Sequence, residues 1–179
     1  QPLAAHALTE RGAALAALGR FDEAEASWSA SLQANPDYIW AHYYRGQASM
    51  VHGRYPDAAA SFERVLERED FYPARLWSWA AHRRAGLAAP PLPVRESWPG
   101  PIGAFLSNEF SAHDLEREAS AARLEIDDRR LVSALYFSAQ RLLPEGKQRA
   151  ARRALRRALA LQTPNHAERA AAAAELARL

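Results

Sequence analysis

The sequence predicts an all-α fold: a right-handed α-solenoid of helical hairpins with an irregular central insertion. Ala, Leu, Arg and Glu dominate the 179 residues, and all four are strong helix formers. The stretch from Gly19 to Trp28 returns, lightly edited, from Gly53 to Phe62. This period of about 34 residues is typical of stacked helical hairpins. Long β-branched runs, which favour sheets, are absent from the sequence.

The composition narrows the functional classes. The net charge is only +2, whereas a nucleic-acid-binding protein needs a clustered basic face, so we expect no nucleic-acid partner. The absence of cysteine excludes a disulfide framework and a cysteine-based zinc site. No apolar run approaches the length of a membrane span. Because the chain starts at Gln1 without a Met or a leader, we expect a trimmed chain, and a lipid anchor could lie upstream.

The first predicted hairpin consists of helices at residues 2–18 and 21–34, within a repeat of about 5–38. Gly12 lies inside the first helix, where glycine costs about 1 kcal/mol relative to Ala. We therefore expect another backbone to approach closely at this position. Gly19 ends the helix, as a C-terminal glycine commonly does.

The second predicted hairpin repeats this plan over about 39–72. Its helices are expected at residues 37–52 and 55–68. Gly46 takes the place of the glycine inside the first helix, and Gly53 makes the turn.

Each second helix carries a small residue four positions before an aromatic one. The pairs are Ala24 with Trp28 and Ala58 with Phe62. The small residue lets the helices approach, and the aromatic ring fills the remaining gap. With the glycines, these pairs resemble the tetratricopeptide repeat, whose pattern includes a Gly element and an Ala-x-x-x-Phe element. The resemblance implies a solenoid of antiparallel hairpins.

The 34-residue repeat pattern is then interrupted. Residues 73–87 start an incomplete third repeat, but prolines between residues 89 and 93 impose an extended segment instead of a second helix. Two short helices are expected within residues 88–127. The first lies at about 102–109, and the second starts at Ser111 with a capping-box pattern.

The period returns over residues 128–163, with helices expected at 128–143 and 147–161. A terminal helix over residues 165–179 is predicted to cap the solenoid, because terminal repeats need a polar outer face. The structural positions of the late repeat are Gly146, Ala151 and Leu155.

The order of these segments is also similar to that of the NlpI-type tetratricopeptide lipoproteins of bacterial envelopes. The residues that carry this similarity are Leu76 to Ala80, Arg84 to Gly86, Trp98 to Pro101 with Phe105 and Leu106, and Ala134 to Phe137. Ala139 and Gln140 depart from the Leu-Gly pair expected there. The resemblance implies an adaptor in the bacterial periplasm or envelope that brings proteases or cell-wall enzymes together, often as a dimer.

Signals for enzyme chemistry are weak. The histidines form no metal-binding spacing, and no Gly-rich phosphate loop occurs. Ser111, His113 and Asp114 are the residue types of a catalytic triad, but capping of a helix start explains them better. Asp127 and Asp128 could bind a cation, although a solvated turn before a helix is favoured. We predict no catalytic residue, no metal and no cofactor.

Five arginines follow helical spacing in the late repeat. They could meet an acidic partner or nucleic acid, but we favour a solvated outer face because no aromatic residue is interleaved with them. The five are Arg149, Arg152, Arg153, Arg156 and Arg157.

The resemblance to tetratricopeptide repeats also indicates where a ligand would bind, since the first helix of each hairpin lines the concave groove in that family. The residues in the groove-facing slots that we expect to bind a protein partner are Trp40, Tyr43, Tyr44, Gln47, Trp77 and Arg84. Alternatively, some of them pack on the Pro-rich segment, which could itself fill the groove. The carboxylate clamp of chaperone-binding relatives is disfavoured, because Thr9, Ala13 and Tyr44 occupy its Lys, Asn and Arg slots.

These observations favour a non-catalytic adaptor or scaffold that binds a peptide or protein segment in the concave groove. One alternative is a structural self-assembly module, because exposed aromatic and Arg side chains could be buried in a homodimer. A less favoured alternative is the accessory domain of an enzyme.

Overall fold

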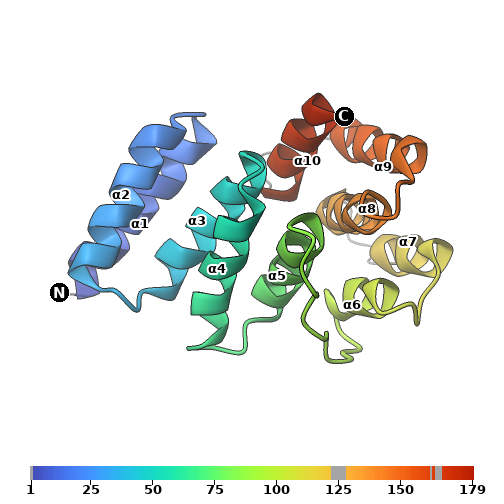
Figure 1. Ribbon diagram of the computed structural model, residues 1–179, viewed down its shortest axis with the longest axis horizontal. Helices are drawn as coiled ribbons and strands as arrows, with labels where there is room; N and C mark the ends of the chain where they lie inside the picture. Colours follow the sequence, from blue (N-terminus) through green and yellow to red (C-terminus); the bar gives the residue numbers. More distant parts are fainter. Residues whose placement is uncertain (1, 122–127, 162, 164–166) are drawn as a thin grey trace.

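The computed structural model describes residues 2–121, 128–161, 163 and 167–179, and over these ranges it contains helices and no strand (Figure 1). The helices are α1 (Pro2–Ala17), α2 (Phe21–Ala34), α3 (Ile39–Val51), α4 (Tyr55–Leu66), α5 (Tyr72–Arg84), α6 (Gly100–Leu106), α7 (Ala112–Ser120), α8 (Asp128–Leu142), α9 (Gln148–Ala160) and α10 (Ala167–Arg178).

Three pairs of consecutive helices pack as antiparallel hairpins: α1 with α2, α3 with α4, and α8 with α9. Figure 1 shows the first two hairpins side by side along the long axis, followed by the shorter central helices and the late hairpin. The expected α-solenoid of helical hairpins is therefore confirmed.

The hairpin turns depend on glycine at Gly19 and Gly53, whose φ angles are 76° and 72°. This left-handed conformation is strained for residues with a side chain, so glycine is favoured there. The next residue closes the helix end in each case. Arg20 donates its backbone N–H to the Leu15 carbonyl at 2.9 Å, and Arg54 donates in the same way to Ser49 at 2.9 Å. The repeated glycine therefore makes the same turn twice.

The aromatic ring of each second helix packs against the glycine inside the first helix. A methyl group at Gly12 would overlap the indole of Trp28, and one at Gly46 would lie 2.7 Å from the ring of Phe62. Both rings are fully buried. The Trp28 indole N–H also donates to the Thr9 carbonyl at 3.2 Å, which fixes the ring between α1 and α2.

After α5 the chain runs back along that helix in an extended conformation. Gly86 lies at the C-terminal end of α5, whereas the Pro93 carbonyl accepts a hydrogen bond from the Tyr72 hydroxyl at 3.1 Å, at the N-terminal end. Arg95 pairs with Asp70 at 2.9 Å near the same end. Prolines prevent a helix here, so this strap (residues 88–95) follows α5 in the chain where the repeat pattern would have a second helix.

The expected capping box at Ser111 is confirmed. Its hydroxyl accepts the Asp114 backbone N–H at 3.1 Å, while its own backbone N–H donates to the Asp114 carboxylate at 3.2 Å. These bonds engage both side chains at the start of α7. The Ser111 hydroxyl also donates to the Asp114 carboxylate at 2.7 Å, and this bond, together with the one from the Ser111 backbone N–H, holds the pKa of Asp114 below its ordinary value.

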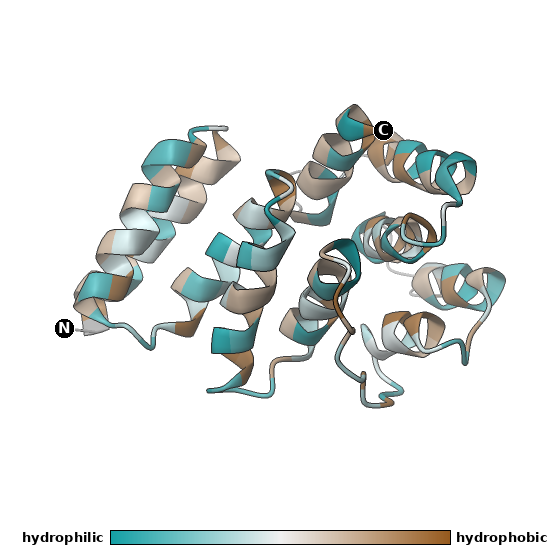
Figure 2. Cartoon of the chain, in the orientation of Figure 1, coloured by the Kyte–Doolittle hydropathy of each residue, from teal (hydrophilic) through white to brown (hydrophobic). Residues whose placement is uncertain are grey.

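Four buried aromatic rings connect the two ends of the main core. Phe62 stacks on Trp77 at 6.0 Å between ring centroids, and Trp77 meets Tyr136 at 5.1 Å and Phe137 at 5.6 Å. A smaller cluster around Leu15 and the Trp28 ring holds the first hairpin. Figure 2 shows the alternation of hydrophilic and hydrophobic residues along α4 and α9 that places apolar side chains in this core.

We expect Gly46→Ala to lower the free energy of unfolding by about 1–3 kcal/mol, because the added methyl group meets Phe62. An open helical position would give the opposite sign, since Ala favours helix by about 1 kcal/mol. Urea denaturation measures the change. Phe62→Leu should relieve the overlap, so the double variant should lose less stability than the sum of the single variants. A stabilised Gly46→Ala variant would contradict the close approach.

His42 should make stability depend on pH. Burial lowers its pKa, although its Nε2 lies 2.9 Å from the Pro36 carbonyl oxygen. Because the unfolded imidazole, with a pKa of about 6.5, binds a proton more readily, this contribution is complete above that pH and is lost as pH falls toward the folded pKa. We expect the free energy of unfolding to decrease from pH 7.5 to 5.5, and to decrease less in His42→Gln. Equal decreases by chemical denaturation would contradict this role.

Candidate functional site

The C-terminal helix α10 returns to the inner face of the solenoid. It contacts α8 and α9, as expected of a terminal helix, but it also contacts α3, more than 100 positions earlier in the sequence (Figure 1). Helices α3 and α8 are first helices of their hairpins, so α10 lies on the side that such helices line. Residues 165 and 166 of the predicted capping helix lie outside the described part of the chain.

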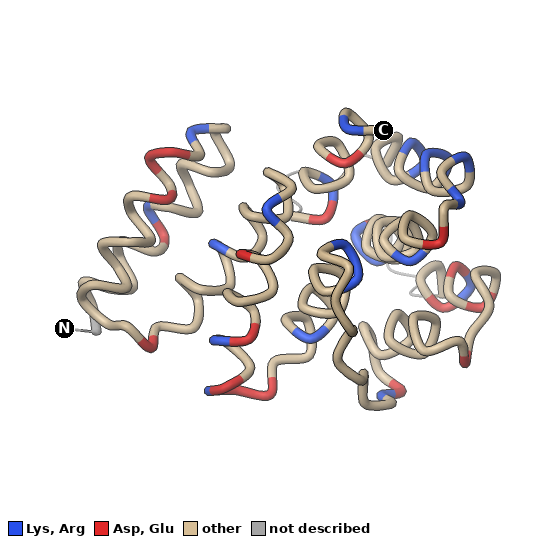
Figure 3. The backbone as a smooth tube through the Cα atoms, in the orientation of Figure 1, with Lys and Arg blue, Asp and Glu red and all other residues tan. Residues whose placement is uncertain are grey.

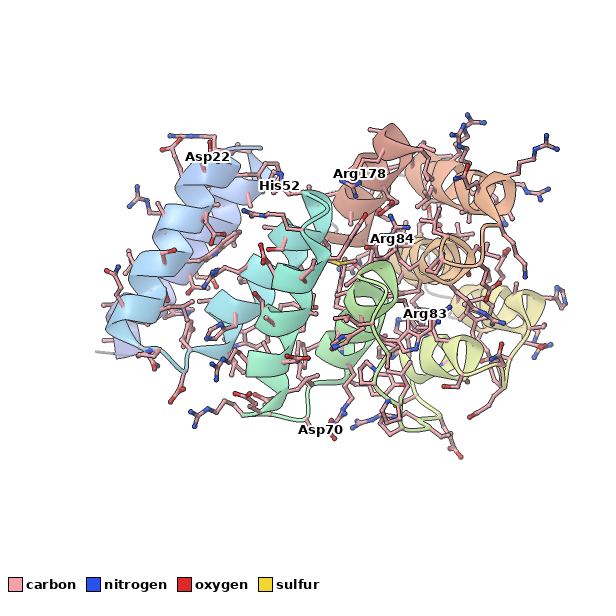
Figure 4. The ribbon with its side chains drawn as sticks, in the orientation of Figure 1. Asp22, His52, Asp70, Arg83, Arg84 and Arg178 are labelled. Atoms are coloured by element: carbon pink, nitrogen blue, oxygen red, sulfur yellow. The ribbon has the colours of Figure 1, made fainter. Side chains whose placement is uncertain are left out.

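A buried carboxylate anchors α10. Glu175 is 1% exposed, and its oxygens lie 2.6 Å from an Arg84 nitrogen and 3.0 Å from the Tyr55 hydroxyl. Arg178 pairs with the same carboxylate at 3.2 Å and donates to the Val51 carbonyl at 2.7 Å. Figure 4 labels Arg84 at the end of α5 and Arg178 at the end of α10, the two helices that this carboxylate joins. The ion pair fixes the position of the terminal helix.

Two of the groove residues predicted from the sequence are engaged in contacts within the chain instead, which corrects their placement. Trp77 is only 1% exposed and lies in the core beneath Tyr136 and Phe137, because α8 packs on α5. Arg84 is taken up by Glu175 and by its own stacking over the Tyr55 ring at 4.7 Å. Neither side chain is open to a partner.

Trp40 and Tyr43 form an aromatic corner at the start of α3. Tyr43 packs edge-on against Phe62 at 5.9 Å and Phe71 at 5.2 Å, and burial raises the pKa of its hydroxyl. Trp40 also packs on Phe71, at 5.4 Å, yet it remains 39% exposed. Of the two, Trp40 offers the more accessible ring.

An open groove of about 620 Å³ separates the first hairpin from α10. Its floor is α3, where Tyr44 and Gln47, both predicted from the sequence, lie together. The strap of residues 88–95 runs along α5 and does not line this groove. The residues that line the groove are Ala13, Ala16, Ala17, Phe21, Trp28, Tyr44, Gln47, Ala48, Val51, Leu159, Thr163, Ala167, Arg169, Ala170 and Ala173.

The α10 wall was missed in the selection of site residues from the sequence. Ala167, Ala170 and Ala173 recur at three-residue spacing and face the groove opposite Ala13 and other alanines of α1. That spacing was a usable signal for an apolar face. The sequence alone did not indicate that this face would meet the first hairpin.

Two polar side chains at the groove wall have hydrogen-bonding capacity to spare. Thr163 is 4% exposed and its hydroxyl has no hydrogen-bond partner. The Arg169 Nε is buried without a partner, while its Nη2 donates to the Leu159 carbonyl at 3.4 Å. Burial raises the pKa of Tyr44, so its hydroxyl remains a donor. These groups suit a ligand that carries carbonyl or carboxylate oxygens.

The described residues include no group of three His, Asp or Glu side chains that could hold a metal ion. Of the acidic pair considered as a cation site, Asp128 is exposed at the start of α8, and Asp127 lies outside the described residues. No helix in the described ranges is long and apolar enough to cross a membrane.

Removing the Glu175 charge should loosen α10. We expect Glu175→Gln to lower the free energy of unfolding by about 2–4 kcal/mol, because Arg84 keeps a charge that is mostly buried and has lost its partner. The matched control is Glu67→Gln, which breaks an ion pair with Arg64 that is exposed on both sides and should cost under about 0.5 kcal/mol. Guanidinium denaturation measures both, and equal losses would contradict the anchoring role.

The comparisons with known proteins agree with this architecture. Residues 9–75 and 43–89 match the family described as tetratricopeptide repeat, and these matches together extend from the middle of α1 to just beyond α5. A search of curated proteins gave no match. Repeats of this family are generally protein-interaction modules and are typically non-catalytic. The segment from residue 9 to residue 89 is therefore similar to the tetratricopeptide repeat family.

Proposed function

We propose that the protein is a non-catalytic adaptor that binds a segment of a partner protein in the groove between α1, α3 and α10. The open groove of about 620 Å³ on the inner face carries this proposal. Its volume lies within the range of about 300–1,000 Å³ that is common for ligand sites. The tetratricopeptide repeats over residues 9–89 support a protein as the ligand.

The lining favours a peptide whose backbone can come close to the walls. Alanines on α1 and α10 leave room on both sides, and the concave face already accepts one Ala-rich helix, α10 itself. Arg169 and Thr163 at one wall, with Gln47 on the floor, provide donors for peptide carbonyls or an acidic side chain. A helical or extended segment with small apolar residues and an acceptor group fits this chemistry.

A role as an envelope adaptor for proteases or cell-wall enzymes is the more specific form of this proposal. It rests on the resemblance of residues such as Trp98 to Pro101 to the NlpI-type lipoproteins. Identifying a protease or a cell-wall enzyme as the groove ligand would support it, whereas a ligand of another class would remove it.

Filling the groove should weaken binding without unfolding the protein. We expect Ala173→Trp to weaken partner binding by at least about tenfold, because the indole takes the space of the ligand. Ala177→Trp is the matched control, since Ala177 is exposed one turn further along α10 and does not line the groove. Circular dichroism should show the same helicity for both variants.

The partner for this measurement can be obtained with a photo-crosslinking residue in place of Gln47, followed by calorimetry with the purified partner. Equal affinity of the two tryptophan variants would overturn the proposed site. Crosslinking to a second copy of the chain, together with a dimer in light scattering, would instead support the self-assembly alternative.

A further inference from the structure

Helix α9 (Gln148–Ala160) presents a face made of arginine. Its residues Ala151, Ala154, Leu155 and Ala158 are buried against the core, and the helix contains no acidic residue. The five arginines of the helix occupy five of the other positions, the rest being Gln148, Ala150, Leu159 and Ala160, and Figure 3 shows several blue segments and no red one along α9. The charge therefore points away from the core.

Three of these arginines have no partner. Arg157 makes two hydrogen bonds to Glu116, at 2.9 and 2.6 Å, which holds the pKa of that carboxyl below its ordinary value. Within the described ranges, Arg149, Arg153 and Arg156 are exposed and have no ion pair or hydrogen bond. The Nε of the half-buried Arg152 also lacks a hydrogen-bond partner. The free charges therefore form one continuous face.

Several exposed arginines of the first two hairpins have partners, although Arg11 in α1 and Arg54, just before α4, make no ion pair or side-chain hydrogen bond within the described residues. Arg20, Arg64 and Arg68 each pair with a carboxylate of this chain, at distances between 2.6 and 3.1 Å. Close to α9 in the sequence or in space, Glu116 already pairs with Arg157. Glu145 already pairs with Arg141 and Lys147. Among the described residues, no carboxylate therefore pairs with Arg149, Arg153 or Arg156.

The spacing of the free arginines suits a linear ligand. Arg149, Arg153 and Arg156 stand at positions i, i+4 and i+7, so they follow one side of the helix over about 10 Å. Guanidinium groups bind carboxylates through two parallel hydrogen bonds. Carboxylates at the same i, i+4 and i+7 spacing on a facing helix would match all three.

Other anionic surfaces fit less well. A helix that lies on a membrane inserts its apolar face, but the apolar face of α9 is buried in the core. The large exposed hydrophobic residues of the described chain, such as Leu87 and Val94, lie outside α9. Nucleic acid would need more phosphate contacts than one short row of arginines offers, and aromatic residues for stacking on single strands are absent from α9.

We propose that the arginine face of α9, formed by Arg149, Arg152, Arg153 and Arg156, docks an acidic helix of a partner protein. This surface lies apart from the groove between α1, α3 and α10, to which α9 contributes only Leu159. An adaptor with both surfaces holds two segments at once, one in the groove and one on the outer side of the late hairpin.

The test uses a fluorescein-labelled helical peptide with Glu at positions i, i+4 and i+7 in an Ala and Gln background, titrated with the whole protein by fluorescence anisotropy. We expect the peptide to bind, with affinity that falls as salt rises, and the same peptide with Gln in place of Glu to bind at least about tenfold more weakly. The triple variant Arg149→Gln, Arg153→Gln, Arg156→Gln should also lose about tenfold, as three exposed ion pairs predict.

The matched control removes the same number of positive charges from a different part of the protein. Arg11→Gln, Arg54→Gln and Arg64→Gln remove three exposed arginines of the first two hairpins and should alter the affinity less than twofold. Equal losses in the two triple variants, or equal binding of the Glu and Gln peptides, would overturn the proposal. Tighter binding of anionic phospholipid vesicles or of a DNA duplex than of the peptide would overturn the acidic helix as ligand. If a variant loses helicity, the fall in the affinity of the unmodified protein for the Glu peptide with rising salt still tests the electrostatic contact.

Discussion

The close approach of two helices across a glycine is the contact on which the architecture depends. Trp28 packs over Gly12 and Phe62 packs over Gly46, so each hairpin closes without a gap. A side chain at either glycine would push the helices apart. Because Phe62 also stacks on Trp77, the fit within the second hairpin sets the position of α5 and, through Tyr136, of the late hairpin. The constraint at Gly46 thus extends through the main core.

The terminal helix then shapes the surface at which we propose that a partner binds. By docking on α3 and α8, α10 covers part of the inner face and turns the rest into a groove with two walls. The Glu175 carboxylate holds it there through Arg84, Tyr55 and Arg178. An isolated row of first helices would expose more surface, but it would lack the Arg169 side of the groove. The selectivity that we propose for the groove therefore comes from both ends of the chain.

The fold was more predictable from the sequence than the site. The period from Gly19 to Gly53 and the Ala-x-x-x-aromatic pairs are local patterns, and each reports directly on a turn or a helix contact. Tyr44 and Gln47 were placed in the groove because they follow the same pattern. Trp77 occupies an equivalent slot but is buried, since α8 covers it from a distant part of the chain. Counting the groove-facing positions of each repeat does not show which helix from a distant part of the chain will cover them.

The sequence by itself determined the all-helical solenoid, its glycine turns and the place where the repeat stops at the prolines after α5. These features depend on backbone conformation and on neighbours within one hairpin, which adjacent residues encode. Only the tertiary structure decided that Arg84 would bind Glu175 and that Ala173 would face the first hairpin across the groove. Both outcomes require segments about 90 or more positions apart to meet, and that meeting is set by the packing of the whole core.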